Sequence, residues 1–221
     1  MPRSRTGPGR CPAPYTWGVY LVTDRSETGG RPLPDVVGAA LRGGIRAVQL
    51  REPDLTARDL LALALELRRL TSRAGAALLV NDRIDVALAC DADGAHLPRH
   101  SFSAADARAL LGPHRLIGVS THAPAEVAAA AAAGADFAVF GPVYDTPSKR
   151  RYGAPLGLAA VGAARAAVPD LPLFCIGGID TERAEAVRAR GADGVAVIRA
   201  VLAAADPAAA AAALLSRLAR R

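Results

Sequence analysis

The sequence contains few of the residues that build disulfide frameworks, metal clusters and membrane spans. Cysteine occurs three times in 221 residues, as Cys11, Cys90 and Cys175, in an odd number and without metal-site spacing. We therefore expect reduced thiols and a cytoplasmic protein. No apolar run is long enough to cross a bilayer, because Gly134 and Pro207 interrupt the alanine-rich stretches. Neither a disulfide framework nor a membrane partner is expected.

Positive charge is abundant but not gathered in one place. The formal net charge is +6 and the isoelectric point is about 9.9, which makes nucleic acid a partner to consider. The arginines are scattered over helical positions, such as Arg58, Arg68 and Arg188, without interleaved aromatic residues. We therefore expect no nucleic-acid partner. The segment 1–14 is rich in Arg, Pro and Gly and lacks the apolar core of a signal peptide, which predicts a flexible N-terminal tail.

One weak repeat organises the rest of the chain. Alanine-rich helical segments end in Gly or in an acidic turn and lead directly into short apolar runs, at residues 41–50, 90–97, 132–140 and 189–198. Strands that alternate with helices predict a parallel sheet. The eight expected strands are Tyr20–Thr23, Ala47–Arg51, Ala77–Asn81, Gly94–Leu97, Ile117–Ser120, Phe137–Gly141, Leu173–Ile176 and Gly194–Ile198, and the last helix is 206–220. This pattern predicts an α/β fold, a single (βα)₈ TIM barrel over residues 15–221, with an open doubly wound sheet as the alternative.

The rarest polar residues fall at strand ends. The chain has one Gln, one Asn and one Lys, namely Gln49, Asn81 and Lys149, although it contains 26 Arg. In a barrel, the C-terminal ends of the strands form the rim on which active sites lie. Arg51 follows Gln49 by two residues and shares its side of the strand. A buried Gln–Arg pair favours an anionic ligand, although a structural ion pair of Arg51 with a glutamate is the alternative.

Two further features belong to the same rim. His122 follows the fifth strand, and its imidazole titrates near neutral pH, which suits proton transfer. The segment 176–179, Ile-Gly-Gly-Ile, follows the seventh strand, where barrels frequently bind phosphate through backbone N–H groups. The composition of the rim therefore predicts a small phosphorylated substrate.

Seven ordered motifs carry a resemblance to a known superfamily: VQLRE (48–52), LLVNDRIDVAL (78–88), ADGAHL (92–97), IGVSTH (117–122), GPVYDTPSK (141–149), IGGI (176–179) and GADGVAVI (191–198). Together they resemble the thiamine phosphate synthase family and its sister, the TenI-type thiazole tautomerases. In the synthase, the resemblance implies that a pyrimidine diphosphate is held by Gln49, Arg51, Asn81, Ser120 and Lys149. It implies that a thiazole phosphate is held by Thr146, Pro147, Ser148, Gly178 and Ile198. Asp82 would then bind Mg²⁺.

Three departures from the synthase pattern guide the choice between the branches. A motif lysine is replaced by Pro53, a second magnesium carboxylate by Ser101, and a serine after the last strand by Arg199. A tautomerase needs neither a leaving group nor a metal, and His122 matches the position of its proton-transferring histidine. We therefore expect a cofactor-free thiazole tautomerase, an isomerase with His122 as catalyst. The alternatives are a Mg²⁺-dependent thiamine phosphate synthase and a non-catalytic regulatory barrel, with homo-oligomerisation left open.

Overall fold

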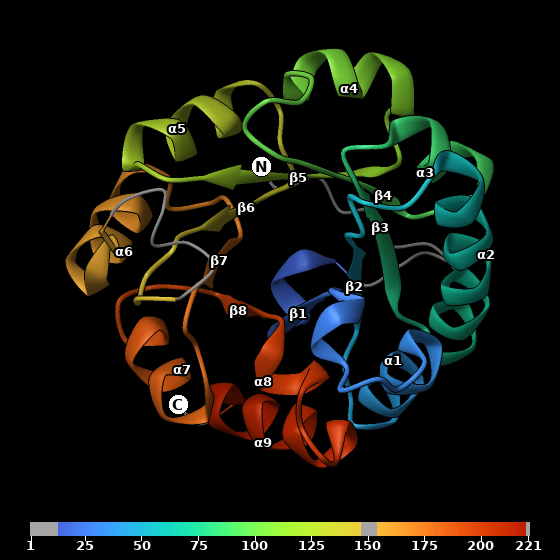
Figure 1. The fold of residues 1–221 in the computed structure, drawn as a ribbon. Coiled ribbons are helices and arrows are strands. Elements are labelled where there is room, and N and C mark those ends of the chain that lie inside the picture. Colours follow the sequence, from blue (N-terminus) through green and yellow to red (C-terminus); the bar gives the residue numbers. More distant parts are fainter. Residues whose placement is uncertain (1–12, 147–153, 220–221) are drawn as a thin grey trace.

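The fold is a closed barrel of eight parallel strands surrounded by helices (Figure 1), seen in a computed structural model that describes residues 13–146 and 154–219. The strands are β1 (Val19–Val22), β2 (Ala47–Leu50), β3 (Ala77–Asn81), β4 (Gly94–Leu97), β5 (Leu116–Thr121), β6 (Phe137–Phe140), β7 (Leu173–Ile176) and β8 (Gly194–Val197). They pair in sequence order, and β8 closes on β1. The predicted TIM barrel is confirmed, and each expected strand boundary lies within one residue of the observed one.

The helices form the outer ring. They are α1 (Leu33–Arg42), α2 (Ala57–Ala74), α3 (Ile84–Ala89), α4 (Ala104–Leu111), α5 (Pro124–Ala132), α6 (Gly157–Ala167), α7 (Thr181–Arg188), α8 (Arg199–Leu202) and α9 (Pro207–Ala219). Short 3₁₀ turns occupy Pro14–Thr16 and Arg25–Glu27. Side-chain caps begin several helices. The Thr56 hydroxyl accepts from the Asp59 N–H at α2, and Ser103 does the same for α4. Within the described ranges, no helix is both long and apolar enough to span a bilayer.

An Asp–Arg latch recurs three times beneath the barrel, at the end where the strands begin. In each case an aspartate just before one strand accepts a backbone N–H at the start of the preceding strand, and it pairs with an arginine of the helix that leads into that preceding strand. The three latches are Asp93 with Leu78 N and Arg68, Asp136 with Ile117 N and Arg108, and Asp193 with Leu173 N and Arg165. The acidic turns of the sequence repeat therefore connect neighbouring βα units, away from the mouth.

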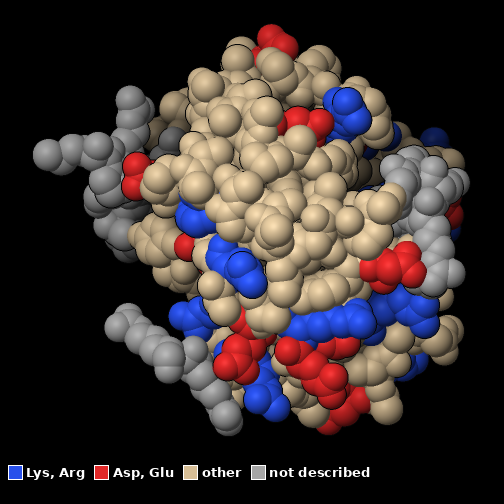
Figure 2. Space-filling model, turned by 90° about the vertical axis from the view of Figure 1, so that its left-hand side faces the viewer, with Lys and Arg blue, Asp and Glu red and all other residues tan. Residues whose placement is uncertain are grey.

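The face over α5 and α6 carries little charge (Figure 2). Glu126 and Arg165 are the only charged residues of these two helices. Where basic side chains do show in this view, acidic ones lie beside them. Charge on this side of the molecule is therefore mixed in sign and gathered at the edge of an apolar, alanine-rich surface.

Inside the barrel, an aromatic cluster fills the space below the mouth. Trp17 lies in T-shaped contact with Phe137, with ring centroids 5.2 Å apart, and Tyr20 contacts Phe137 in the same way at 5.4 Å. Phe174 completes the cluster at 5.8 Å from Phe137. These side chains are less than 2% exposed. The barrel is therefore packed at its base, and the inward polar side chains lie above this cluster, toward the mouth.

Candidate active site

Alternation along the strands brings the predicted polar residues to one place. Gln49, Asn81 and Ser120 lie on the inward phase of β2, β3 and β5, and Arg51 continues that phase beyond β2. The register places Asn81 beside His96 of β4, and His96 beside Gly118 of β5. These side chains therefore converge at the C-terminal ends of neighbouring strands, where barrel active sites lie.

Gln49 lies deep in the barrel and makes its hydrogen bond inward. Its side chain is buried, and its Nε2 donates to the Tyr20 hydroxyl at 3.2 Å. Burial raises the pKa of Tyr20 above its ordinary value, and the hydrogen bond with Gln49 offsets this only in part. Tyr20 is therefore a neutral phenol at any working pH, and Gln49 is held in one orientation by it.

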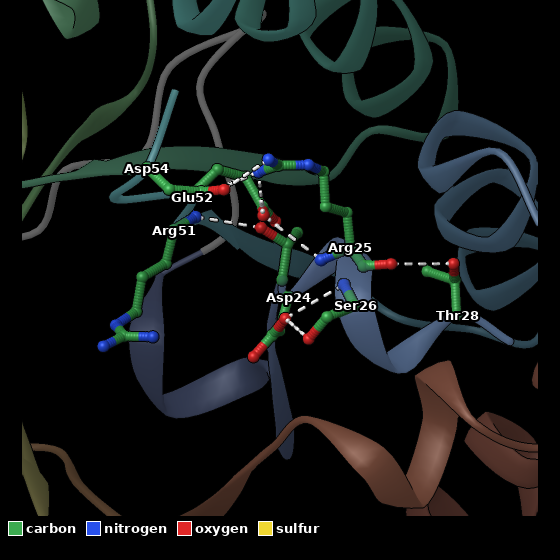
Figure 3. A network of polar contacts seen from close by, with 8 residues as sticks. Asp24, Arg25, Ser26, Thr28, Arg51, Glu52 and Asp54 are labelled. Carbon is green, nitrogen blue, oxygen red and sulfur yellow. Dashed lines mark hydrogen bonds and ion pairs between the residues drawn. The ribbon is translucent and has the colours of Figure 1, made fainter. Parts of the chain in front are cut away.

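Arg51 lies above Gln49, and its guanidinium has no carboxylate partner within the described ranges. Its backbone N–H donates to the Thr23 hydroxyl at 2.9 Å, and this bond fixes the main chain without involving the side chain. Arg51 does not form an ion pair with any described glutamate, which was the structural alternative. The adjacent Glu52 pairs instead with Arg25 at 3.3 Å, and Arg25 also makes a two-point ion pair with Asp54. Arg51 extends away from this cluster (Figure 3).

The Arg25 cluster ties the loop after β1 to the loop after β2. Glu52 is only 4% exposed, and its Oε2 accepts from both the backbone N–H and the guanidinium of Arg25. Glu52 and Asp54 neutralise the positive charge of this guanidinium. The hydrogen bond from Arg25 in turn lowers the pKa of Asp54. The cluster therefore positions the loop that begins at Arg51 without adding a free cation.

Asp82 lies at the end of β3 in a shallow pocket of about 330 Å³ with His100, Ser101 and Phe102. Its φ of 63° is left-handed, which is uncommon for a residue other than glycine and typical of functional loops. The Ser101 hydroxyl is buried without a partner among the described residues, and His100 Nε2 lies 3.8 Å from the Asp82 carboxylate. The pocket therefore offers oxygen donors beside one carboxylate.

The oxygen atoms of this pocket determine whether it could bind a magnesium ion. No group of three or more His, Cys, Asp or Glu that could hold a metal occurs in the described part of the chain. Mg²⁺ prefers oxygen ligands and commonly combines one or two carboxylates with water and substrate phosphate oxygens. Asp82, with the unpartnered Ser101 hydroxyl nearby, fits such a shared site, in which a diphosphate substrate supplies the other ligands.

His122 also lies at the mouth, exposed, just after β5. Its Nδ1 is 2.5 Å from the carbonyl oxygen of Gly141, and its backbone N–H donates to Glu126 at 2.7 Å. Because a carbonyl can only accept, Nδ1 carries the proton in this contact. His122 therefore connects the loop after β5 to the loop after β6.

The loops after β6, β7 and β8 carry the residues predicted for a second phosphate. Gly178 has a φ of 63°, and a Cβ there would lie 3.0 Å from the Asp145 carbonyl oxygen, so only glycine fits this close approach. Thr146 Oγ1 is buried without a partner among the described residues. Ile198 lies directly before α8. Pro147, Ser148 and Lys149 lie outside the described residues, so their placement stays a prediction.

Two features of the site were missed in the sequence. Arg183 of α7 donates to the Gly178 carbonyl at 2.7 Å and lies 4.8 Å above the Tyr144 ring, which places a cation beside the glycine loop. His96 is absent from the site residues predicted from the sequence, yet its Nε2 lies 2.9 Å from Ser120 Oγ. Its position two residues after Gly94, on the inward phase, is the signal that could have identified it.

Comparisons with known proteins agree with the geometry of the mouth. The family model described as thiamine monophosphate synthase matches residues 19–201. A thiamine-phosphate synthase of Moorella thermoacetica is 47% identical over 195 residues, covering 88% of this chain and 92% of the relative. One of Roseiflexus castenholzii is 46% identical over 213 residues, covering 95% and 93%. The structure of a thiamine phosphate pyrophosphorylase from Pyrococcus furiosus superposes with a TM-score of 0.84 at 33% identity, covering 93% and 96%.

These findings contradict the expectation of a thiazole tautomerase. That interpretation depended on three single-residue departures, Pro53, Ser101 and Arg199, and on the position of His122. Relatives that match nearly the whole chain are named as synthases, which is the alternative that the sequence left open. The departures alter the charge at individual positions, whereas the polar set around Gln49, Arg51, Asn81 and Ser120 is complete. The isomerase interpretation of this chain is therefore wrong.

Proposed function

The chain belongs to the thiamine monophosphate synthase family, and from this we propose that it joins a hydroxymethylpyrimidine diphosphate to a thiazole phosphate with release of pyrophosphate. It is an enzyme of thiamine biosynthesis. The observation that carries the proposal is the convergence of Arg51, Asn81 and Ser120 on the mouth above Gln49. A guanidinium with no carboxylate partner in the described part of the chain, one amide and one hydroxyl match the oxygens of a diphosphate.

The reaction breaks one bond and forms another without proton transfer. The bond between the pyrimidine methylene carbon and the diphosphate oxygen breaks, and its electron pair leaves with pyrophosphate. The thiazole ring nitrogen then uses its lone pair to form the new C–N bond. Catalysis therefore consists of positioning the two rings and stabilising the charge that develops on the leaving group.

Each residue of the mouth has a part in this scheme. Arg51 pairs with the diphosphate, and Asn81 and Ser120 donate hydrogen bonds to its oxygens. Gln49, held by Tyr20, faces the pyrimidine ring from below. Gly178, Thr146 and Ile198 receive the thiazole phosphate on the opposite side of the mouth. Asp82 would hold Mg²⁺ beside the diphosphate, and the ion, when bound, would neutralise part of the leaving group's charge.

The scheme gives His122 no proton to carry, and this makes the proposal testable. His122→Asn keeps a donor near the Gly141 carbonyl but removes the titratable ring. We expect this variant to form thiamine phosphate within a few-fold of the wild-type rate. Loss of a general acid–base group typically costs about 10²–10⁴-fold. A loss of that size in thiamine phosphate formation, with unchanged thermal stability, would contradict the scheme.

A further inference from the structure

His96 is a buried imidazole that touches the site through one atom. It is 2% exposed, and its ring lies 5.9 Å from both the Tyr20 and the Phe137 ring centroids. Its Nε2 is 2.9 Å from Ser120 Oγ, whereas its Nδ1 is buried without a protein partner among the described residues. Within the described residues, the ring therefore has one polar contact, which is with Ser120 at the mouth.

Gly118 makes room for this ring. A Cβ at position 118 would lie 2.7 Å from His96 Nδ1 and 2.3 Å from Phe137 Cζ, so any side chain there would displace the imidazole or the phenyl ring. The backbone of Gly118 consequently presents a C–H group toward Nδ1. A C–H group can face a nitrogen lone pair favourably, but it offers nothing to an N–H donor.

The imidazole is neutral at any working pH. Burial lowers the pKa of His96 to about 3, and the positive charge of the nearby Arg51 acts in the same direction. A neutral imidazole carries one N–H, on either Nδ1 or Nε2. If Nδ1 carried it, a buried donor would lack an acceptor, which is rarer in proteins than an under-satisfied acceptor. The contacts therefore favour the form in which Nε2–H donates to Ser120.

This proton placement determines what Ser120 can do. Its Oγ accepts from His96, so the hydroxyl proton must be donated elsewhere. Ser120 is partly exposed on the inward phase of β5, and its only side-chain hydrogen bond to a described residue is the one with His96. We propose that His96 is a positioning residue whose Nε2–H holds the Ser120 hydroxyl as a hydrogen-bond donor to an oxygen of the substrate diphosphate. The inference rests on the proposed function for the identity of that anion.

The proton placement is measured first, on the intact protein without ligand. Side-chain ¹⁵N spectra distinguish the two neutral forms of the ring and its cation. Between about pH 5 and pH 8, His96 should remain neutral with Nε2 protonated. A protonated Nδ1, or titration of His96 within this range, overturns the inference whatever the enzyme's substrate is.

The coupling is measured next, with inorganic pyrophosphate as the probe in calorimetry. His96→Leu should weaken pyrophosphate binding by about fivefold or more, the effect of losing one hydrogen bond to a charged group. His96→Gln, whose amide nitrogen can reach Ser120, should recover most of the affinity, and His114→Gln is the exposed control. In a Ser120→Ala background, His96→Leu should cost no further affinity. Additive effects of the two substitutions would assign His96 a merely structural role.

The outcomes separate this inference from the proposed function. If wild type binds neither pyrophosphate nor the pyrimidine diphosphate, the proposed function fails, and the substrate half of this inference fails with it. If both ligands bind and His96 acts independently of Ser120, only this inference fails. If His96→Leu does not fold, the ¹⁵N spectra and the His96→Gln variant still decide it.

Discussion

Arg25 and Glu52 pair across 27 residues of sequence, so that the loop after β1 is connected to the loop that begins at Arg51. Glu52 is almost fully buried, while the partner guanidinium is 40% exposed. Arg51, which we propose binds the diphosphate, thus follows a strand whose end is anchored by a different ion pair. The positive charge of Arg51 remains available because its neighbouring carboxylate already has a partner.

Replacing Glu52 tests this anchoring. Glu52→Gln keeps the shape of the side chain but removes the charge that Arg25 contacts. We expect the free energy of unfolding to fall by about 1.5–3 kcal/mol, the range for a hydrogen bond to a charged group. We also expect a higher KM for the pyrimidine diphosphate, because the loop at Arg51 loses its connection. Urea unfolding and steady-state kinetics measure the two effects. A stability loss with an unchanged KM would show that the cluster does not position Arg51.

Replacing Arg51 should affect the kinetics and leave the stability nearly unchanged. Arg51→Gln removes the unpaired guanidinium, and we expect kcat/KM for the pyrimidine diphosphate to fall about tenfold or more. Thermal stability should change little, because no described carboxylate depends on this side chain. Arg58→Gln, on the exposed face of α2, is the matched control. Equal kinetics for the two variants would exclude Arg51 from diphosphate binding.

Acid should destabilise the protein partly through His96. Its pKa is lowered to about 3 in the folded protein, whereas an unfolded chain has a value near 6.5. Between these values the unfolded state binds more protons, so the free energy of unfolding falls as the pH falls, by up to about 1.4 kcal/mol per pH unit. Unfolding in urea between about pH 7 and pH 5 should show this extra slope for wild type relative to His96→Gln. Parallel curves would contradict a neutral buried His96.

Magnesium binding should depend on the diphosphate. Asp82 is one carboxylate beside an uncharged hydroxyl, so we expect weak binding of Mg²⁺ alone and much tighter binding with inorganic pyrophosphate present. Asp82→Asn should weaken the combined complex by about tenfold or more, since even indirect partners of metal ligands contribute that much. Calorimetry measures both. Tight binding of Mg²⁺ without pyrophosphate, or an unaffected Asp82→Asn variant, would exclude the shared site.

The sequence predicts the barrel well because its local signals agree. Apolar runs bounded by Gly or Asp define the strands, and the Asp–Arg latches at Asp93, Asp136 and Asp193 explain why those acidic turns recur. The period of two also places Gln49 and Arg51 on the inward side. Periodicity gives the side of a strand but not the partner across it. The contact of His96 with Ser120 and the pair of Arg25 with Glu52 depend on barrel register and loop shape, so they could not be predicted.

The prediction of a tautomerase was wrong because single residues at the mouth do not determine the reaction. Pro53, Ser101 and Arg199 were treated as losses that the synthase chemistry could not tolerate. Among the described residues, the guanidinium of Arg51 has no carboxylate partner, and Arg199 pairs with Glu27 at 3.2 Å. A diphosphate can supply the charged oxygen ligands that a carboxylate at position 101 would otherwise provide. Charge at such a mouth is shared among the protein, the substrate and an ion, so the loss of one side chain does not identify the reaction.

The most direct measurement of the central claim is the product formed by the purified protein with the pyrimidine diphosphate, the thiazole phosphate and Mg²⁺ together. Mass spectrometry of the mixture should show thiamine phosphate and pyrophosphate accumulating in equal amounts, and neither should form when one substrate is omitted. Absence of thiamine phosphate under these conditions, in a protein that is folded and binds pyrophosphate, would contradict the assignment of this barrel as a synthase.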